Sequence, residues 1–106
     1  MSDVCIALMT APSMEVAQRI VSSAVENGLA ACGNIVPQVI SVYRWQGAMH
    51  TDAEVLVIFK TTRALFAKLG EHVTTLHPYD VPELIQIDVP DGTSSYLQWV
   101  RESVMG

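Results

Sequence analysis

The stretch Glu54-Val55-Leu56-Val57-Ile58-Phe59-Lys60-Thr61 decides the fold, because it is typical of a β-strand that is apolar on both faces. Successive side chains of a strand point to opposite faces, so Val55, Val57 and Phe59 share one face and the two residues between them share the other. A sheet with one face in water carries polar residues at alternate positions, and this strand does not. We therefore expect its second face to be covered by another copy of the chain or by a partner.

The strands expected around this stretch are apolar runs bounded by turn residues. Pro37 interrupts one of them, and a proline inside a strand indicates an edge position, a bend or a bulge. A loop that begins at Gln46-Gly47 joins two of the runs as an antiparallel hairpin. The expected strands are Val4–Thr10, Leu29–Val36 continued by Gln38–Trp45, Asp52–Thr61 and Leu84–Val89.

Three helices are expected from capping residues and from apolar residues three and four apart. Ser13 caps the first helix, and Asn27-Gly28 ends it. Thr61-Thr62 can cap the second, which Pro78 ends, and the third begins through Ser94 or Ser95. The inward positions expected are Ala17, Ile20, Val21, Ala24 and Val25, then Leu65, Phe66, Leu69, Val73 and Leu76, then Tyr96, Leu97, Val100 and Val104.

The order β-α-β-β-α-β with an added C-terminal helix predicts an α+β fold in a single domain spanning residues 1–106. Two split βαβ units of this kind form a ferredoxin-like sandwich, with an antiparallel sheet and both helices on one face. RNA-binding domains share this topology, but they stack bases on sheet aromatics. The strand quoted above offers one aromatic residue, so we exclude that function.

The composition excludes some classes of binding partner. The net charge of −5, with six Lys and Arg, argues against nucleic acid and against an anionic membrane as the main partner. No apolar run approaches the roughly 20 residues of a membrane span, and the start lacks a basic leader, so a cytoplasmic location is expected. Cys5 and Cys32 are expected to be free thiols. Only 16% of the residues are charged, which also favours self-association.

Candidate chemistry concentrates in His77-Pro78-Tyr79-Asp80-Val81-Pro82-Glu83-Leu84, where two prolines stiffen a backbone that carries a histidine, a tyrosine and two carboxylates. This segment is either a rigid helix-to-strand connection or part of a site. His77 is either a ligand or a histidine that bonds helix-end carbonyls. His50 is expected in the hairpin loop, exposed to solvent, and His72 on the exposed side of its helix. No metal-binding spacing of His and Cys occurs.

Four further residues could take part in binding. Met9 could ligate soft Cu(I) or could fill a gap in the core. Lys60 lies on the same strand face as Glu54, either reaching water or forming an ion pair, for example with Glu83. With Arg44, Trp45 could grip an anion and stack on a flat ligand, or it could anchor an interface. Lys60, Glu83 and Tyr79 would suffice for proton transfer if they lined one cleft.

Five segments together resemble the CutA family of divalent-cation tolerance proteins. They are Thr10-Ala11-Pro12, Leu29-Ala30-Ala31-Cys32, Tyr43-Arg44-Trp45-Gln46-Gly47, Glu54 with Lys60-Thr61-Thr62, and the segment 77–84. The resemblance runs in order from about Val4 to Trp99. It implies a ferredoxin-like subunit in a tight homotrimer, with β-pairing between subunits and clefts at their boundaries.

The resemblance also implies a copper or other divalent-cation site built from a cysteine and two adjacent histidines. In this sequence those positions are Met9, Leu76 and His77, so one of three ligands is kept and the implied binding is weak. The leading hypothesis is a CutA-like, cytoplasmic, non-enzymatic homotrimer linked to divalent-cation tolerance. It would bind a metal ion or a small anionic ligand in clefts between subunits near His77, Tyr79, Glu83 and Lys60, with Trp45 in the same cleft. The alternatives are a PII-like small-molecule sensor and, more weakly, an enzyme with a Glu83/Lys60 acid/base pair.

Overall fold

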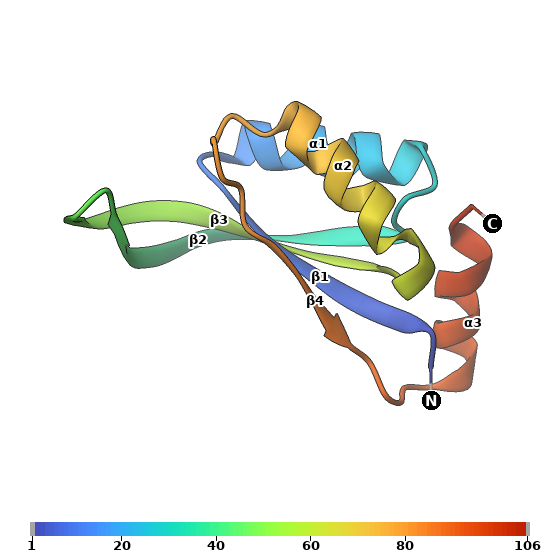
Figure 1. Cartoon of the computed structure of the whole chain (residues 1–106). Helices are drawn as coiled ribbons and strands as arrows, with labels where there is room; N and C mark the ends of the chain where they lie inside the picture. Colours follow the sequence, from blue (N-terminus) through green and yellow to red (C-terminus); the bar gives the residue numbers. More distant parts are fainter. Residues whose placement is uncertain (1, 106) are drawn as a thin grey trace.

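The sheet has four antiparallel strands in the order β2-β3-β1-β4, with two helices packed on one of its faces (Figure 1). The structure is a computed structural model that describes residues 2–105. This arrangement confirms the expected α+β, ferredoxin-like fold with an added C-terminal helix. The elements are β1 (Val4–Ala11), α1 (Met14–Glu26), β2 (Cys32–Trp45), β3 (Ala48–Thr62), the 3₁₀ turn η1 (Arg63–Leu65), α2 (Phe66–Leu76), β4 (Leu84–Asp88) and α3 (Ser94–Ser103).

The core lies between the sheet and the helices α1 and α2. The expected inward face of β3 is fully buried there, with Val57 and Phe59 both at 0% exposure. They pack with Ile20 of α1 and Leu69 of α2, which are also fully buried. Burial of these side chains contributes about 1.5–3 kcal/mol each, and it holds the two helices on this face.

The second face of the sheet is apolar apart from Lys60 and, in the single chain, largely open, and we call it the open face. Ile6, Lys60 and Ile87 lie opposite one another in one row, and Leu8, Ile58 and Ile85 in the next. Ile85 and Ile87 are exposed, and the β1 and β3 members of both rows are half-buried. Helix α3 covers one end of this face, where Leu97 and Val100 bury Val4. The apolar second face predicted from β3 is therefore present.

The first helix begins and ends as its capping residues predict. The Ser13 hydroxyl accepts a hydrogen bond from the Val16 amide at 3.2 Å, and Gly28 adopts a positive φ of 70° just after the helix. That left-handed conformation favours glycine. Four of the five expected inward residues are buried, but Val25, in the last turn of the helix, is 39% exposed.

The two runs around Pro37 form the single edge strand β2, with a register shift between Val36 and Val39. Both the edge position and the bulge agree with the proline. The hairpin turns at Gln46 and Gly47, which have φ of 50° and 79°, as in a tight two-residue turn. Because β3 begins at Ala48 instead of Asp52, His50 lies in a strand, half-buried and stacked on Tyr43 with ring centroids 5.3 Å apart. The expectation of a solvent-exposed loop histidine is wrong.

The start of α2 also differs from expectation. Thr62 occupies the N-cap position of η1 without a side-chain cap hydrogen bond, and Leu65 occupies that of α2. Thr61 and Thr62 are both buried at the end of β3. The Thr61 hydroxyl donates to the Leu29 carbonyl at 2.7 Å, and η1 leads into α2. His72 is not on a solvent-exposed side of α2 either. It is half-buried, and its Nε2 lies 2.7 Å from the Ser23 hydroxyl of α1.

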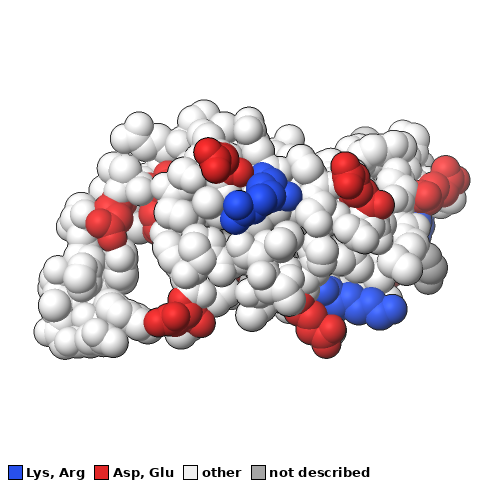
Figure 2. Space-filling model, turned by 90° about the horizontal axis from the view of Figure 1, so that it is seen from above, with Lys and Arg blue, Asp and Glu red and all other residues white. Residues whose placement is uncertain are grey.

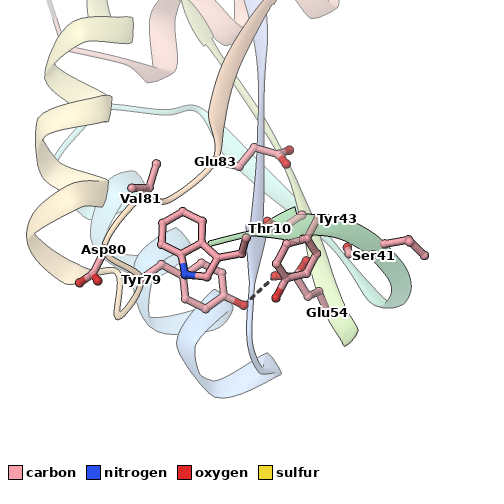
Figure 3. Close-up of a pocket in the computed structure, with 10 residues that line it drawn as sticks. Thr10, Ser41, Tyr43, Glu54, Tyr79, Asp80, Val81 and Glu83 are labelled. Atoms are coloured by element: carbon pink, nitrogen blue, oxygen red, sulfur yellow. Dashed lines mark hydrogen bonds between the residues drawn. The ribbon is translucent and has the colours of Figure 1, made fainter. Parts of the chain in front are cut away.

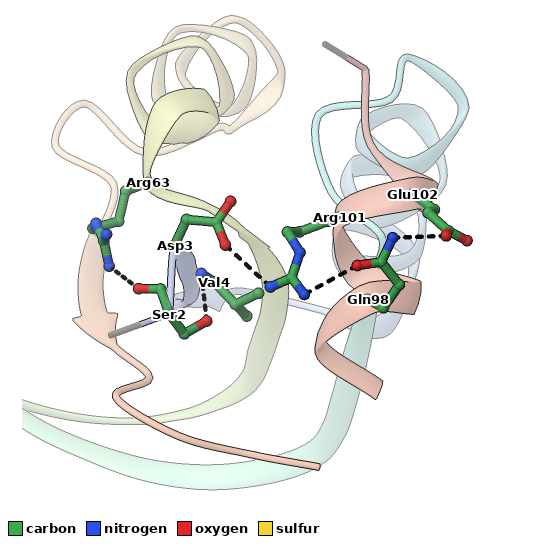
Figure 4. A network of polar contacts seen from close by, with 7 residues as sticks. All are labelled: Ser2, Asp3, Val4, Arg63, Gln98, Arg101 and Glu102. Atoms are coloured by element: carbon green, nitrogen blue, oxygen red, sulfur yellow. Dashed lines mark hydrogen bonds and ion pairs between the residues drawn. The ribbon is translucent and has the colours of Figure 1, made fainter. Parts of the chain in front are cut away.

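Polar contacts hold α3 against the beginning of β1 (Figure 4). Arg101 forms an ion pair with Asp3 at 3.2 Å and also contacts Gln98, which donates to Glu102. On this helix Tyr96 is 42% exposed, so its expected inward position is wrong.

Both cysteines are free thiols, as expected. Cys5 is fully buried, and burial raises the pKa of its thiol to about 11. Cys32 is half-buried, with its sulfur 3.8 Å from the Tyr96 hydroxyl. No helix within residues 2–105 is long and apolar enough to cross a membrane.

Candidate functional site

A pocket of about 530 Å³ lies where the β2–β3 hairpin extends away from the helices, and we call this extension the hairpin arm (Figures 1 and 3). Its walls come from the end of β1, from both strands of the arm and from the segment 77–84. The lining residues are Thr10, Ser41, Val42, Tyr43, Trp45, Glu54, Tyr79, Asp80, Val81 and Glu83.

The buried side chain of His77 positions the segment 77–84 against the sheet. His77 follows the last residue of α2 and has extended backbone geometry, as expected before a proline. Its Nε2 lies 2.7 Å from the Thr10 carbonyl, and its Nδ1 accepts from the Tyr79 amide at 3.2 Å. Because a carbonyl only accepts and an amide N–H only donates, these partners place the ring proton on Nε2. The carbonyl belongs to β1, not to the end of α2.

Tyr79 then reaches the arm. Its hydroxyl donates to Oε2 of Glu54 at 2.6 Å, and Glu54 is only 9% exposed (Figure 3). Burial, and then the hydrogen bond to this carboxylate, raise the pKa of the Tyr79 phenol. A second pair lies further along the arm, where Tyr43 donates to Asp52 and this bond raises the pKa of Tyr43. The bond between Tyr79 and Glu54 joins the segment 77–84 to β3.

The charge of the pocket is negative. Glu54, Asp80 and Glu83 line it, and within residues 2–105 no lysine or arginine does. On the face shown in Figure 2, the part nearest the hairpin arm carries carboxylates and no lysine or arginine side chain. Since carboxylates attract cations and repel anions, this lining favours a cation over the small anionic ligand that we expected.

Of the predicted ligand-binding residues, the structure brings together Trp45, Tyr79 and Glu83 in this pocket. Lys60 lies elsewhere, six residues beyond Glu54 on β3, which is about 20 Å along an extended strand. Its ammonium group contacts the Asn34 side chain on β2. Lys60 and Glu83 therefore do not form an ion pair within one chain.

Neither of the two predicted metal ligands lines the pocket. Met9 is fully buried and packs in the core beneath the helices, and both ring nitrogens of His77 already have partners. Leu76, at the third position, packs against the same core. Within residues 2–105 no three His, Cys, Asp or Glu side chains come together as metal ligands would. These residues do not fit a soft-metal site.

Sequence reasoning included Asp80 in the candidate segment 77–84, but it did not single out Tyr43 as a site residue or predict the bond between Tyr79 and Glu54. The available signal was a carboxylate, Glu54, in an otherwise apolar strand. Such a group either reaches water or needs a partner, and the only kind of partner that we considered was one of opposite charge. The structure supplies a phenol instead.

The sequence of this chain is similar to those of one known protein family. The sequence profile of the family described as "CutA1 divalent ion tolerance protein" matches residues 5–103. A "Divalent-cation tolerance protein CutA" from Thermus thermophilus is 49% identical over 98 residues, which cover 92% of this chain and 95% of that relative. Human "Protein CutA" is 44% identical over 96 residues, 91% of this chain. The chain spans 54% of the human protein, about half of its length.

Solved structures show the same architecture. A divalent cation tolerance protein from Thermus thermophilus superposes with a TM-score of 0.94 at 47% identity, covering 96% of this chain and 99% of that one. An Archaeoglobus fulgidus structure, described as a periplasmic divalent cation tolerance protein CutA, has a TM-score of 0.93 at 33% identity, with 96% and 99% covered. Similarity at these levels extends through the sheet, the helices and the hairpin arm.

Proposed function

The chain belongs to the CutA1 divalent ion tolerance family, and from this premise we propose that it acts in cation tolerance as a self-assembled, non-enzymatic binding protein. The observation that supports self-assembly is the exposed apolar surface of the open face. Ile58, Ile85 and their neighbours form a continuous apolar surface that one chain leaves in contact with water. Covering such a surface is the main favourable contribution to association.

The assembly we propose is a homotrimer, the state implied by the family resemblance. Two features of this chain support a closed assembly. The edge strand β2 leaves one side of its backbone unpaired by this chain, and the hairpin arm projects beyond the helices, which leave it uncovered (Figure 1). Clefts near His77, Tyr79, Glu83 and Lys60 would then form between subunits, and any contact between Lys60 and Glu83 would need two copies of the chain.

The proposed ligand is a cation held in the pocket at the base of the arm. Carboxylate oxygens are ligands that hard divalent cations prefer, whereas thioether and thiolate ligands select copper in its reduced form. Glu54, Asp80 and Glu83 supply oxygens, but they do not converge as a ligand cage. Binding of a divalent metal by one chain is therefore expected to be weak, and Met9 is not expected to take part.

Calorimetric titration with Cu(II), Cu(I) and Zn(II) tests this function. We expect a small heat of binding that Glu83→Gln reduces and that Met9→Leu leaves unchanged, because Met9 does not line the pocket and leucine has a similar volume. A strong Cu(I) signal abolished by His77→Ala would instead favour the ligands implied by the family. No heat with any of the three ions would refute cation binding by this pocket.

A PII-like sensor remains the second candidate, because the same sheet topology with clefts between subunits also suits small-molecule binding. A thermal-shift screen of nucleotides would favour it if a hit were lost in Lys60→Ala, since Lys60 would have to supply the positive charge that the pocket lacks. An enzyme that uses Glu83 and Lys60 as an acid/base pair would likewise need both residues from different subunits. The cytoplasmic location stays a prediction.

A further inference from the structure

We propose that the pocket at the base of the hairpin arm binds an organic cation, a small ammonium or guanidinium compound, in preference to a bare metal ion. This inference rests on the proposed function of the pocket as the ligand site of the protein, and it names the class of ligand. Three independent features carry it: a buried carboxylate without a cation, a lining of aromatic rings, and a cavity much larger than an ion.

The first feature is Glu54. Its side chain is more than nine-tenths buried at the wall of the cavity, and one oxygen accepts from Tyr79. Within residues 2–105, no other residue donates to it, and the ion pair that the structure describes is Arg101 with Asp3, far from the arm. A buried carboxylate without a cation is costly, and a cationic ligand in the cavity would offset that cost.

The second feature is the aromatic lining. Tyr43, Trp45 and Tyr79 all face the same cavity. A cation over the face of such a ring is attracted by the electrons of the ring, most strongly over tryptophan and most often when the cation is weakly hydrated. Both tyrosines donate their hydroxyl protons to carboxylates, Tyr43 to Asp52 and Tyr79 to Glu54, which leaves the rings richer in electrons.

The third feature is size. The cavity of about 530 Å³ lies within the range of roughly 300–1,000 Å³ that is usual for small-molecule sites. A metal ion instead needs several ligands within about 2–2.6 Å of one point. No three His, Cys, Asp or Glu side chains of residues 2–105 gather in that way. Dispersed carboxylates between aromatic walls match an extended organic cation better than an ion.

Tryptophan fluorescence provides the test. The chain has two tryptophans, so Trp99→Phe, at an exposed position of α3 outside the pocket, leaves Trp45 as the single reporter. Choline chloride and tetramethylammonium chloride are titrated into this protein. The neutral control is 3,3-dimethylbutan-1-ol, which has the shape of choline without its charge. We expect saturable changes with both cations and an affinity for the alcohol at least about tenfold lower, equivalent to about 1.4 kcal/mol.

Two variants locate the binding. Glu54→Gln keeps an acceptor for the Tyr79 hydroxyl but removes the charge, and it should weaken choline binding about tenfold. Glu83→Gln tests the same idea at an exposed position, where misfolding is not a concern. Glu26→Gln is the matched control, because Glu26 is exposed at the end of α1 and does not line the pocket. It should bind choline as the parent protein does.

The proposal is overturned if neither cation gives a saturable change, if the alcohol binds as well as choline, or if Glu26→Gln weakens binding as much as Glu54→Gln and Glu83→Gln do. These outcomes are separable from failure of the proposed function. Metal heats that depend on Glu83, together with no choline binding, would keep cation tolerance and reject the organic cation. The converse result would keep this site and reject the metal as its ligand.

Discussion

Replacing Tyr79 by phenylalanine removes one hydroxyl and leaves the ring in place, so it isolates the hydrogen bond that joins the segment 77–84 to β3. The Tyr79 hydroxyl lies 2.6 Å from Oε2 of Glu54, which is 9% exposed. A hydrogen bond to a charged acceptor contributes about 1.5–3 kcal/mol to stability. Because Tyr79 itself is 36% exposed, water from the cavity can replace part of the lost bond. We expect a loss of about 1.5 kcal/mol, the lower end of the range.

The assay is urea unfolding followed by far-ultraviolet circular dichroism, with the parent and variant proteins at one chain concentration, because assembly makes stability depend on concentration. Tyr43→Phe is the matched control. It removes the same hydroxyl from a tyrosine in the hairpin arm whose acceptor, Asp52, is exposed. It should leave the free energy of unfolding essentially unchanged.

Equal and negligible effects of the two substitutions would refute the reasoning. Glu54 would then be adequately hydrated without Tyr79, and the segment 77–84 would be held against β3 by other contacts. The carboxylate could no longer be treated as a buried charge, and the electrostatic argument for a cationic ligand would fail with it.

Three further predictions concern titration and assembly. The variant Cys32→Ser leaves Cys5 as the only thiol, and burial raises the pKa of this thiol to about 11. At pH 8 it should therefore react with dithionitrobenzoate at least about a hundredfold more slowly than in the unfolded protein. Equal rates in the folded and unfolded protein would contradict its burial. The pKa of Tyr79 in the folded protein lies above the unfolded value of about 10, so the phenol's contribution to stability is complete below pH 10 and is lost as the pH rises further. In urea unfolding, the free energy of unfolding should therefore fall less between pH 8 and pH 11 in Tyr79→Phe than in the parent protein. Ile58→Glu places a charge in the middle of the open face, so size-exclusion chromatography should show dissociation or aggregation, and unchanged assembly would argue that another surface is used.

Much of the fold could be predicted because its signals are local. The helix limits at Ser13 and Gly28, the bulge near Pro37 and the double-faced pattern of β3 each depend on a few neighbouring residues. The start of α2 could not be predicted in this way. A threonine pair is a capping signal in isolation, but here Thr61 ends a strand and bonds Leu29, 32 residues away.

The site was predictable in part for a related reason. The segment 77–84 and Trp45 carry unusual residue types, so they were recognised as candidates, and the structure places Trp45, Tyr79 and Glu83 around one cavity. The positions of Lys60 and Glu54 relative to this cavity depend on strand register. It aligns Lys60 with Ile6 and Cys32, far from Glu83, and it places Glu54 opposite Val39 near the base of the arm. Register depends on pairing between distant segments, which the order of residues along one strand does not reveal.

Sedimentation velocity at micromolar concentration tests most directly whether the open face is covered by further copies of the chain. We predict one folded species of about 35 kDa, three copies of the 11.6 kDa chain. A folded, soluble species of 11.6 kDa would contradict the account, because the apolar second face of the sheet would then be stable in water and no cleft between subunits could form.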